Sequence, residues 1–144
     1  MPAGMLNEED LSGNIVKRAR DTNMRILIVD DSRAMRMIVR RTLRQAGFDG
    51  CAEVEAANGR EALDQVQAVA PDLILSDWNM PEMNGLELLR ELKRRGSSAT
   101  FGFVTSESSP DMQVAALQEG ALFFITKPFT ADKFQSTLEP LLRS

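Results

Sequence analysis

The sequence lacks two residue types entirely, histidine and tyrosine, among its 144 residues. A chain without histidine cannot form a Ser-His-Asp triad or a histidine-ligated zinc site. It also cannot carry a phosphohistidine from which to donate a phosphoryl group. These absences exclude one class of hydrolytic site, one class of metal site and one class of phosphoryl donor.

Cysteine and long apolar segments are equally scarce. Cys51 is the only cysteine, which excludes a disulfide within the chain, and its strand-like surroundings favour a small core residue over a reactive thiol. No apolar run approaches the roughly 20 residues needed to span a bilayer. The N-terminus does not pair a basic start with an apolar block, so we expect no signal peptide and a cytoplasmic location.

The charge balance is acidic, with 17 lysines and arginines against 21 aspartates and glutamates and a net charge of −4. Nucleic acids and anionic membranes attract basic patches, so neither is expected as a partner. Residues 1–23 are polar with weak apolar periodicity, and we expect them to form a flexible N-terminal extension. Residues 24–144 are long enough for one domain with its own core.

Strand-like and helix-like segments alternate along this domain. Short apolar runs predict five strands, at Met24–Val29, Cys51–Ala56, Leu73–Ser76, Thr100–Val104 and Leu122–Ile125. Helical spacing and cap residues predict five helices, at Ser32–Ala46, Asn58–Val69, Leu86–Arg95, Asp111–Glu119 and Ala131–Leu142. The alternation predicts an α/β fold, (βα)₅, with a parallel sheet covered on both faces. Gly102 interrupts the fourth strand, where a packed side chain is expected.

Polar residues follow four of the five predicted strands. Asp30 and Asp31 follow the first strand, Asp77 the third, Thr105 the fourth, and Lys127 the fifth. In an open parallel sheet the functional site lies at the carboxyl ends of the strands. With the strand order 2-1-3-4-5 these four strands are neighbours, so we expect the five side chains to converge.

Three carboxylates at one place repel one another, and a hard divalent cation relieves that repulsion. Mg²⁺ prefers oxygen ligands and takes a few carboxylates together with water or phosphate oxygens. We expect Asp31 and Asp77 to be direct ligands and Asp30 to bind directly or through water. A backbone carbonyl near Asn79 could complete the protein's share.

A positive charge and a hydroxyl complete this set. The ammonium of Lys127 is suited to pairing with Asp77 or a phosphoryl oxygen, and the Thr105 hydroxyl can donate a hydrogen bond to the same oxygen. A metal, an ammonium and a hydroxyl around one carboxylate can stabilise phosphoryl transfer to that carboxylate. Each residue alone is more often a cap, a turn former or a structural residue, and it is the combination that favours chemistry.

The motifs around these residues resemble the receiver domain of two-component response regulators. The resemblance spans Arg25 to Leu142 and is carried by four stretches: ILIVDDS (Ile26–Ser32), LILSDWNMPEMNGLELL (Leu73–Leu89), FVTSES (Phe103–Ser108) and FFITKPF (Phe123–Phe129). The DWNMP stretch and MRMIVRRTL (Met35–Leu43) are most similar to the stand-alone chemotaxis regulators of that family. The resemblance implies a doubly wound, flavodoxin-like sheet of strand order 2-1-3-4-5.

The resemblance also implies roles for the residues at the strand ends. Asp77 is the phosphoacceptor, Asp30 and Asp31 hold Mg²⁺, and Thr105 and Lys127 contact the phosphoryl group. The peptide bond between Lys127 and Pro128 is expected to be cis. The phosphoryl donor is expected to be a histidine kinase or a phosphotransfer domain.

A conformational switch is a further implication. Thr105 moves toward the phosphoryl group and Phe124 turns inward, which remodels the surface formed by the fourth helix, the fifth strand and the last helix. A downstream target or a phosphatase is expected to bind that surface. Chemotaxis regulators usually carry a tyrosine at the position of Phe124, so a contact that uses its hydroxyl is an open question here. The alternative is that Phe124 is an ordinary core residue.

Two groups of polar residues have less specific interpretations. Asn79 and Glu107 lie two residues beyond Asp77 and Thr105, and we predict that they tune dephosphorylation; the alternative is a pair of exposed loop residues. The first predicted helix carries five arginines, interpreted as a solvated face, with docking of an acidic kinase or phosphotransfer domain as the alternative. They are Arg33, Arg36, Arg40, Arg41 and Arg44.

The leading hypothesis is therefore a single-domain response regulator rather than an enzyme with turnover. A phosphate sink, an intermediate phosphorelay receiver and a receiver that works without phosphate are alternatives. A Mg²⁺ phosphatase with an aspartyl nucleophile would show Asp-x-Asp, whereas Asp77 is followed by Trp78 and Asn79. A flavodoxin-like cofactor binder would need a neutral phosphate cradle after the first strand, where Asp30 and Asp31 stand.

Overall fold

The computed structural model describes residues 24–142, and the expected extension, residues 1–23, lies outside the described part of the chain. Five parallel strands form one sheet in the order β2-β1-β3-β4-β5, which confirms the predicted fold. The strands are β1 (Arg25–Val29), β2 (Ala52–Ala56), β3 (Leu73–Ser76), β4 (Thr100–Thr105) and β5 (Phe123–Thr126).

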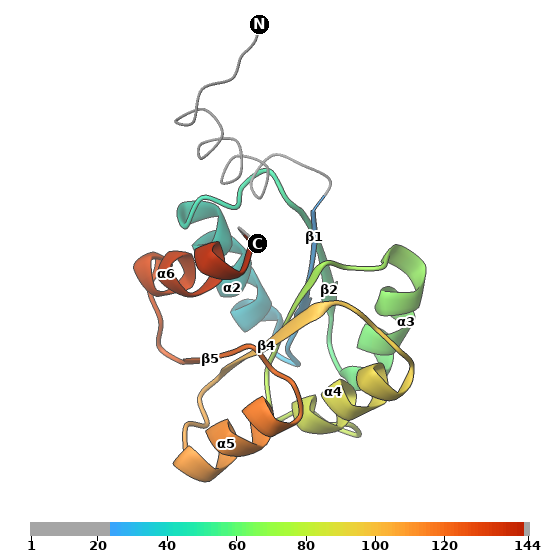
Figure 1. Cartoon of the computed structure of the whole chain (residues 1–144). Coiled ribbons are helices and arrows are strands. Elements are labelled where there is room, and N and C mark those ends of the chain that lie inside the picture. Colours follow the sequence, from blue (N-terminus) through green and yellow to red (C-terminus); the bar gives the residue numbers. More distant parts are fainter. Residues whose placement is uncertain (1–23, 143–144) are drawn as a thin grey trace, which may run out of the picture.

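Helices cover both faces of this sheet, as Figure 1 shows. They are α2 (Arg33–Gln45), α3 (Gly59–Val69), α4 (Gly85–Arg94), α5 (Pro110–Gln118) and α6 (Ala131–Leu142). Helices α2 and α6 pack on one face, and α3, α4 and α5 pack on the other. Among residues 24–142, no helix is both long enough and apolar enough to cross a membrane.

The core consists of two apolar layers, one on each side of the sheet. Successive residues of a strand point to opposite faces, so Ile26 and Ile28 of β1 join the layer under α2 and α6. Leu27 and Val29 join the layer under α3, α4 and α5. All four side chains are buried. A central strand that is apolar on both faces explains the uninterrupted apolar run in the sequence.

Several helix boundaries differ from the prediction by one residue, because cap residues lie just outside the helices they stabilise. Ser32 is the N-cap of α2, and its hydroxyl oxygen accepts a hydrogen bond from the Met35 amide at 3.1 Å. Asn84 caps α4 in a reciprocal capping box with Glu87. Strand β4 extends to Thr105, one residue further than expected.

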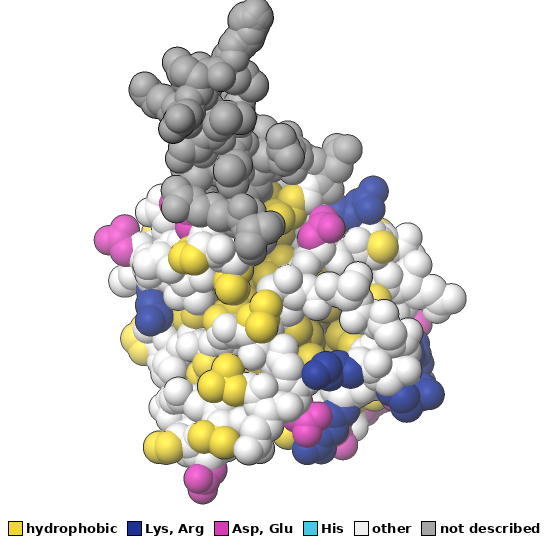
Figure 2. All heavy atoms as spheres, in the orientation of Figure 1, with side chains coloured by type: hydrophobic (Ala, Val, Ile, Leu, Met, Phe, Trp, Pro, Cys, Tyr) yellow, Lys and Arg dark blue, Asp and Glu magenta, His cyan; other side chains and the backbone are white. Residues whose placement is uncertain are grey.

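The exposed surface mixes basic and acidic side chains. In Figure 2 they lie side by side in the region that Figure 1 assigns to α4. There Arg95 pairs with Glu91 at 2.8 Å and Arg90 pairs with Glu119 of the α5 end at 3.3 Å. Exposed pairs of this kind contribute little to stability, so the fold depends chiefly on the two apolar layers.

Gly102 does not interrupt β4, which runs unbroken through it. Its register partner on β5 is Phe123, and the Phe123 ring lies over the glycine so closely that a Cβ at position 102 would overlap it. The packed side chain expected at this point therefore comes from the neighbouring strand. The glycine provides the space that the ring fills.

This packing predicts that Gly102→Ala destabilises the protein. We expect the free energy of unfolding in urea to fall by about 1–3 kcal/mol, because the added methyl overpacks the core. In a Phe123→Leu background the same substitution should cost less, since the overlapping ring is gone. An alanine variant as stable as the parent in both backgrounds would contradict this account of the packing.

Candidate functional site

The sheet register brings the acidic residues to one edge. Val29 at the end of β1 lies opposite Ser76 at the end of β3. The ladder continues past these strands, because the Asp77 amide donates to the Val29 carbonyl at 2.8 Å and the Asp30 amide donates to the Ala56 carbonyl at 3.1 Å. The two aspartates that follow the central strands are thereby held side by side.

Three carboxylates gather at this edge: Asp30, Asp31 and Asp77 each place an oxygen within 4.8 Å of the others. Asp30 and Asp77 are buried, with 3% and 9% of their surface exposed, whereas Asp31 is exposed. Asp31 and Asn79 line a shallow hollow beside the cluster. An all-oxygen donor set that opens to solvent on one side fits a hard divalent cation such as Mg²⁺.

Lys127 brings a positive charge into this cluster. Its Nζ lies 2.9 Å from Asp30 Oδ2 and 3.5 Å from Asp77 Oδ2. The sequence pointed to Asp77 as its partner, and the structure adds a closer contact with Asp30. The Lys127 amide donates to the Thr105 carbonyl at 2.9 Å, and the Lys127–Pro128 peptide bond is cis, the isomer that the family resemblance implies.

Burial dominates the electrostatics of Asp30. Desolvation raises the pKa of its carboxyl group above the ordinary value, and the nearby Asp77 charge acts in the same direction. Hydrogen bonds from the Ser32 amide at 2.9 Å and from Lys127 oppose this rise without overcoming it. Three carboxylates face the one ammonium of Lys127 in this cluster, and that imbalance of charge favours an additional cation.

Asp77 has its two carboxylate oxygens in different surroundings. Oδ1 accepts a hydrogen bond from the Trp78 amide at 2.7 Å, and Oδ2 faces the Lys127 ammonium. One oxygen is thus oriented by the main chain of its own loop. The other lies next to a positive charge that can stabilise negative charge developing on it.

The remaining polar residues form a chain between two loops. Thr105 is buried at the end of β4, and its hydroxyl oxygen accepts from the Glu107 amide at 3.3 Å. The Asn79 side-chain amide donates to the Glu107 carboxylate at 2.9 Å. This contact joins the loop after β3 to the loop after β4 at the rim of the acidic cluster. The sequence placed Asn79 and Glu107 near the site, and the structure shows that they contact each other.

Phe124 belongs to an aromatic group that begins beside Asp77. Its ring is half-buried and lies 5.8 Å from the Phe103 ring and 6.4 Å from the Trp78 ring, measured between centroids. Trp78 and Phe103 are 4.8 Å apart. A continuous set of rings therefore connects the residue after Asp77 to β5.

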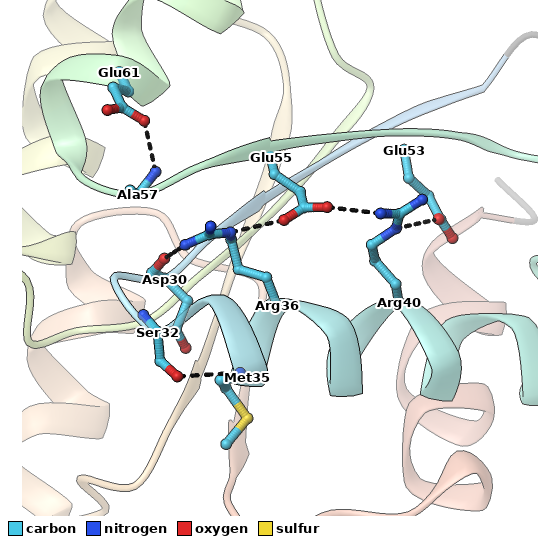
Figure 3. Close-up of polar contacts among 9 residues, drawn as sticks. All are labelled: Asp30, Ser32, Met35, Arg36, Arg40, Glu53, Glu55, Ala57 and Glu61. Carbon is cyan, nitrogen blue, oxygen red and sulfur yellow. Dashed lines mark hydrogen bonds and ion pairs between the residues drawn. The ribbon is translucent and has the colours of Figure 1, made fainter.

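Sequence analysis missed two residues that shape this site. Gly85 lies just before the helix expected at Leu86–Arg95, and a Cβ there would overlap the Asp77 carbonyl oxygen, so only glycine lets α4 begin against the site. Arg36 was placed on a solvated helix face, yet its Nη1 donates to the Asp30 carbonyl at 2.6 Å (Figure 3). No local pattern distinguishes Arg36 from the other arginines of its helix.

Comparison with known proteins is consistent with this geometry. Residues 26–139 match the response regulator receiver domain family. The chemotaxis protein CheY of Bacillus subtilis is 38% identical over 118 residues, which cover 82% of this chain and 97% of that protein. The CheY of Listeria monocytogenes is 37% identical over 116 residues, or 81% and 96% of the two chains.

Solved structures show the same likeness. The chemotaxis response regulator CheY4 of Vibrio cholerae superposes with a TM-score of 0.73 at 34% identity, covering 83% of this chain and 99% of that one. A CheY-like receiver domain protein from Methanospirillum hungatei has a TM-score of 0.75 at 29% identity, covering 84% and 94%.

The buried charge of Asp30 predicts a stability cost in the metal-free protein. Because the folded-state pKa is raised, the contribution of this group to stability is present below its ordinary value of 3.8 and is lost as the pH rises through the raised value. We expect Asp30→Asn to increase the free energy of unfolding in EDTA at neutral pH by about 1 kcal/mol. The gain should vanish in acid, where the native carboxyl group is already protonated.

Urea titrations of the two proteins at neutral and acidic pH provide the measurement. Asp49→Asn is the matched control, because Asp49 is an exposed turn residue outside the cluster and its replacement should leave both curves unchanged. A loss of stability in Asp30→Asn at neutral pH would mean that the pairing with Lys127 outweighs the desolvation of Asp30.

Proposed function

Because the chain belongs to the response regulator receiver domain family, we propose that it is a phosphorylation-driven signalling switch that accepts a phosphoryl group on Asp77. The observation that carries the proposal is the placement of Asp77 between two further carboxylates and the ammonium of Lys127. A nucleophilic carboxylate beside both a cation site and a lysine suits phosphoryl transfer.

The transfer is a displacement at phosphorus. A carboxylate oxygen of Asp77 forms a bond to phosphorus while the bond from phosphorus to the donor's imidazole nitrogen breaks, and the imidazole leaves with the electron pair. The donor is the phosphohistidine of a histidine kinase or of a phosphotransfer domain. The small molecule acetyl phosphate reacts in the same way, with acetate as the leaving group. The chain catalyses only its own phosphorylation and dephosphorylation in this scheme.

Asp30, Asp31 and Asp77, together with the Asn79 carbonyl, are the proposed Mg²⁺ ligands. When bound, Mg²⁺ supplies positive charge that relieves the repulsion of the carboxylates and attracts phosphoryl oxygens. Lys127 contributes a second positive charge, next to Asp77 and Asp30. Thr105 is the proposed hydrogen-bond donor to the phosphoryl group, because a hydroxyl can donate its proton while its oxygen accepts from the Glu107 amide.

The proposed readout is a change of surface on the far side of Thr105. Thr105 and Phe124 move together, and the surface formed by α5, β5 and α6 changes its affinity for a downstream protein or a phosphatase. Apolar side chains are exposed on this side of the molecule: Val114 and Leu117 on α5 and Leu122 before β5 are each more than half exposed.

The similarity to two CheY proteins supports a role in chemotaxis as part of this proposal. Phe124 means that the readout proceeds without the hydroxyl of a tyrosine. A phosphate sink or an intermediate relay receiver uses the same chemistry and differs only in whether a target binds. A cytoplasmic location remains a prediction.

The phosphatase alternative is less well supported by the structure. A second acid two residues after the nucleophile is its hallmark, and Asn79 occupies that position with its amide bound to Glu107. An amide cannot act as a general acid. Turnover of a small phosphate ester by the purified protein would favour this alternative.

Incubation with acetyl phosphate and Mg²⁺ tests the proposal directly. Intact-mass measurement should show a single phosphoryl adduct on the wild type and none on Asp77→Asn or in EDTA. Asp111→Asn, which alters an exposed aspartate in the first turn of α5, is the control that should still be modified once. A folded wild type without an adduct would refute the proposal, as would an adduct that persists in Asp77→Asn.

The contact between Asn79 and Glu107 predicts their effect on dephosphorylation. The two groups lie at the rim of the cluster, where a carboxylate held by an amide can orient an attacking water. We expect Asn79→Ala and Glu107→Ala each to lengthen the acyl-phosphate half-life several-fold. The double variant should show less than the product of the two effects, because the residues act as a pair.

Loss of the adduct over time, followed by intact mass after removal of the phosphoryl donor, measures these half-lives. Ser108→Ala changes the next exposed side chain of the same loop and should leave the half-life unaltered. Half-lives that match the wild type in both single variants would show that the pair has no role in hydrolysis.

A further inference from the structure

Alternating charges join α2 to the edge strand β2. Arg36 Nε lies 2.7 Å from Glu55 Oε1, and Arg40 Nη1 lies 2.7 Å from the other oxygen of Glu55. Arg40 Nε lies 3.0 Å from Glu53 Oε1, which Arg44 Nη2 also approaches at 3.1 Å. We refer to these five residues as the charge ladder. Figure 3 shows its contacts from Arg36 to Glu53.

The geometry of a helix lying along a strand produces this ladder. Four residues rise about 6 Å along an α-helix, and two residues rise about 6.6 Å along a strand, so every fourth residue of α2 meets every second residue of β2. The expectation of a solvated arginine face is therefore wrong for Arg36 and Arg40. Their side chains bind the two glutamates that β2 turns toward α2.

One end of the ladder reaches the acidic cluster. Besides Glu55, the Arg36 guanidinium binds the Asp30 carbonyl through Nη1 at 2.6 Å (Figure 3). The Arg36 side chain is only 14% exposed, so this charge-assisted hydrogen bond is shielded from water. The carbonyl belongs to the peptide group that links Asp30 to Asp31. Its orientation therefore affects both carboxylates.

Stability alone does not account for the ladder. The Glu53 side chain is 4% exposed, and its Oε2 is buried without a hydrogen-bond partner in the described part of the chain. Burying such an oxygen costs free energy, and buried ion pairs can often be replaced by apolar residues without loss of stability. The fixed direction of the guanidinium at Asp30 points to a different role.

We propose that Arg36 is a positioning residue for the cation site: anchored by Glu55, it fixes the peptide between Asp30 and Asp31 so that both carboxylates face the bound ion. This inference rests on the function proposed for the same site. It extends that function to the edge strand, because Glu55 on β2 holds the arginine in place. Arg40 and Arg44 belong to the ladder without contacting Asp30, so the role belongs to Arg36 alone.

Mg²⁺ titrations by calorimetry compare Arg36→Met with Arg40→Met. Methionine keeps most of the apolar stem and removes the guanidinium in both variants. Arg40→Met breaks two contacts of the ladder and leaves the bond to the Asp30 carbonyl intact, which makes it the matched control. We expect Arg36→Met to weaken Mg²⁺ binding about 10-fold, a common effect of removing a residue that orients a metal ligand. Arg40→Met should bind Mg²⁺ like the wild type.

Urea unfolding and NMR separate positioning from a general loss of structure. Both variants lose ion pairs, so we expect urea unfolding to show a loss of stability in each. Only Arg36→Met should shift the amide signal of Asp31, whose nitrogen shares the peptide group with the Asp30 carbonyl. Glu55→Gln should weaken Mg²⁺ binding in the same direction as Arg36→Met, and the two effects should not multiply in the double variant. Glu55→Gln also tests the inference if Arg36→Met fails to fold.

The outcomes distinguish this inference from the function on which it rests. Mg²⁺ binding as tight in Arg36→Met and Glu55→Gln as in the wild type overturns the positioning role and leaves the proposed function intact. Equal losses in Arg36→Met and Arg40→Met also overturn it, because the ladder would then act only as scaffold. A wild type that binds no Mg²⁺ overturns both.

Discussion

The mutual repulsion of three carboxylates is the constraint on which the rest of this structure depends. One oxygen from each of Asp30, Asp31 and Asp77 lies within 4.8 Å of the others. They meet because parallel strands end at one edge of the sheet and backbone hydrogen bonds align the ends of β1 and β3. Burial adds a separate cost, since desolvation raises the pKa of Asp30. Lys127 offsets part of it, and a cation would offset more.

Two glycines allow close packing next to this site and within the sheet. Gly85 lets α4 begin against the Asp77 carbonyl, and Gly102 makes room for the Phe123 ring of β5. The aromatic rings of Trp78, Phe103 and Phe124 then connect the site to β5 on the opposite face from α2. Tightly packed interiors respond to small shifts as units, which suits a protein whose signal must reach its surface.

The charge ladder supports the site from the other direction. It ties α2 to β2, the edge strand that carries no reactive residue at its end, and reaches Asp30 through Arg36. A strand without a reactive residue at its end thereby contacts, through Glu55, the arginine that binds the Asp30 carbonyl. Asp30 therefore has contacts that lead to both edge strands. Lys127, which follows β5, pairs with its carboxylate, and Arg36 of α2, which Glu55 of β2 binds, donates to its carbonyl.

The alternation of strands and helices could be predicted from the sequence, as could their bounds to within about one residue and the five polar residues at the strand ends. Periodicity, caps and the ends of apolar runs are local properties. Three contacts, by contrast, depend on the packed fold: Lys127 lies closer to Asp30 than to Asp77, Phe123 fills the space over Gly102, and Arg36 binds the Asp30 carbonyl. These contacts join residues whose distances depend on how whole elements pack, and no local pattern encodes them.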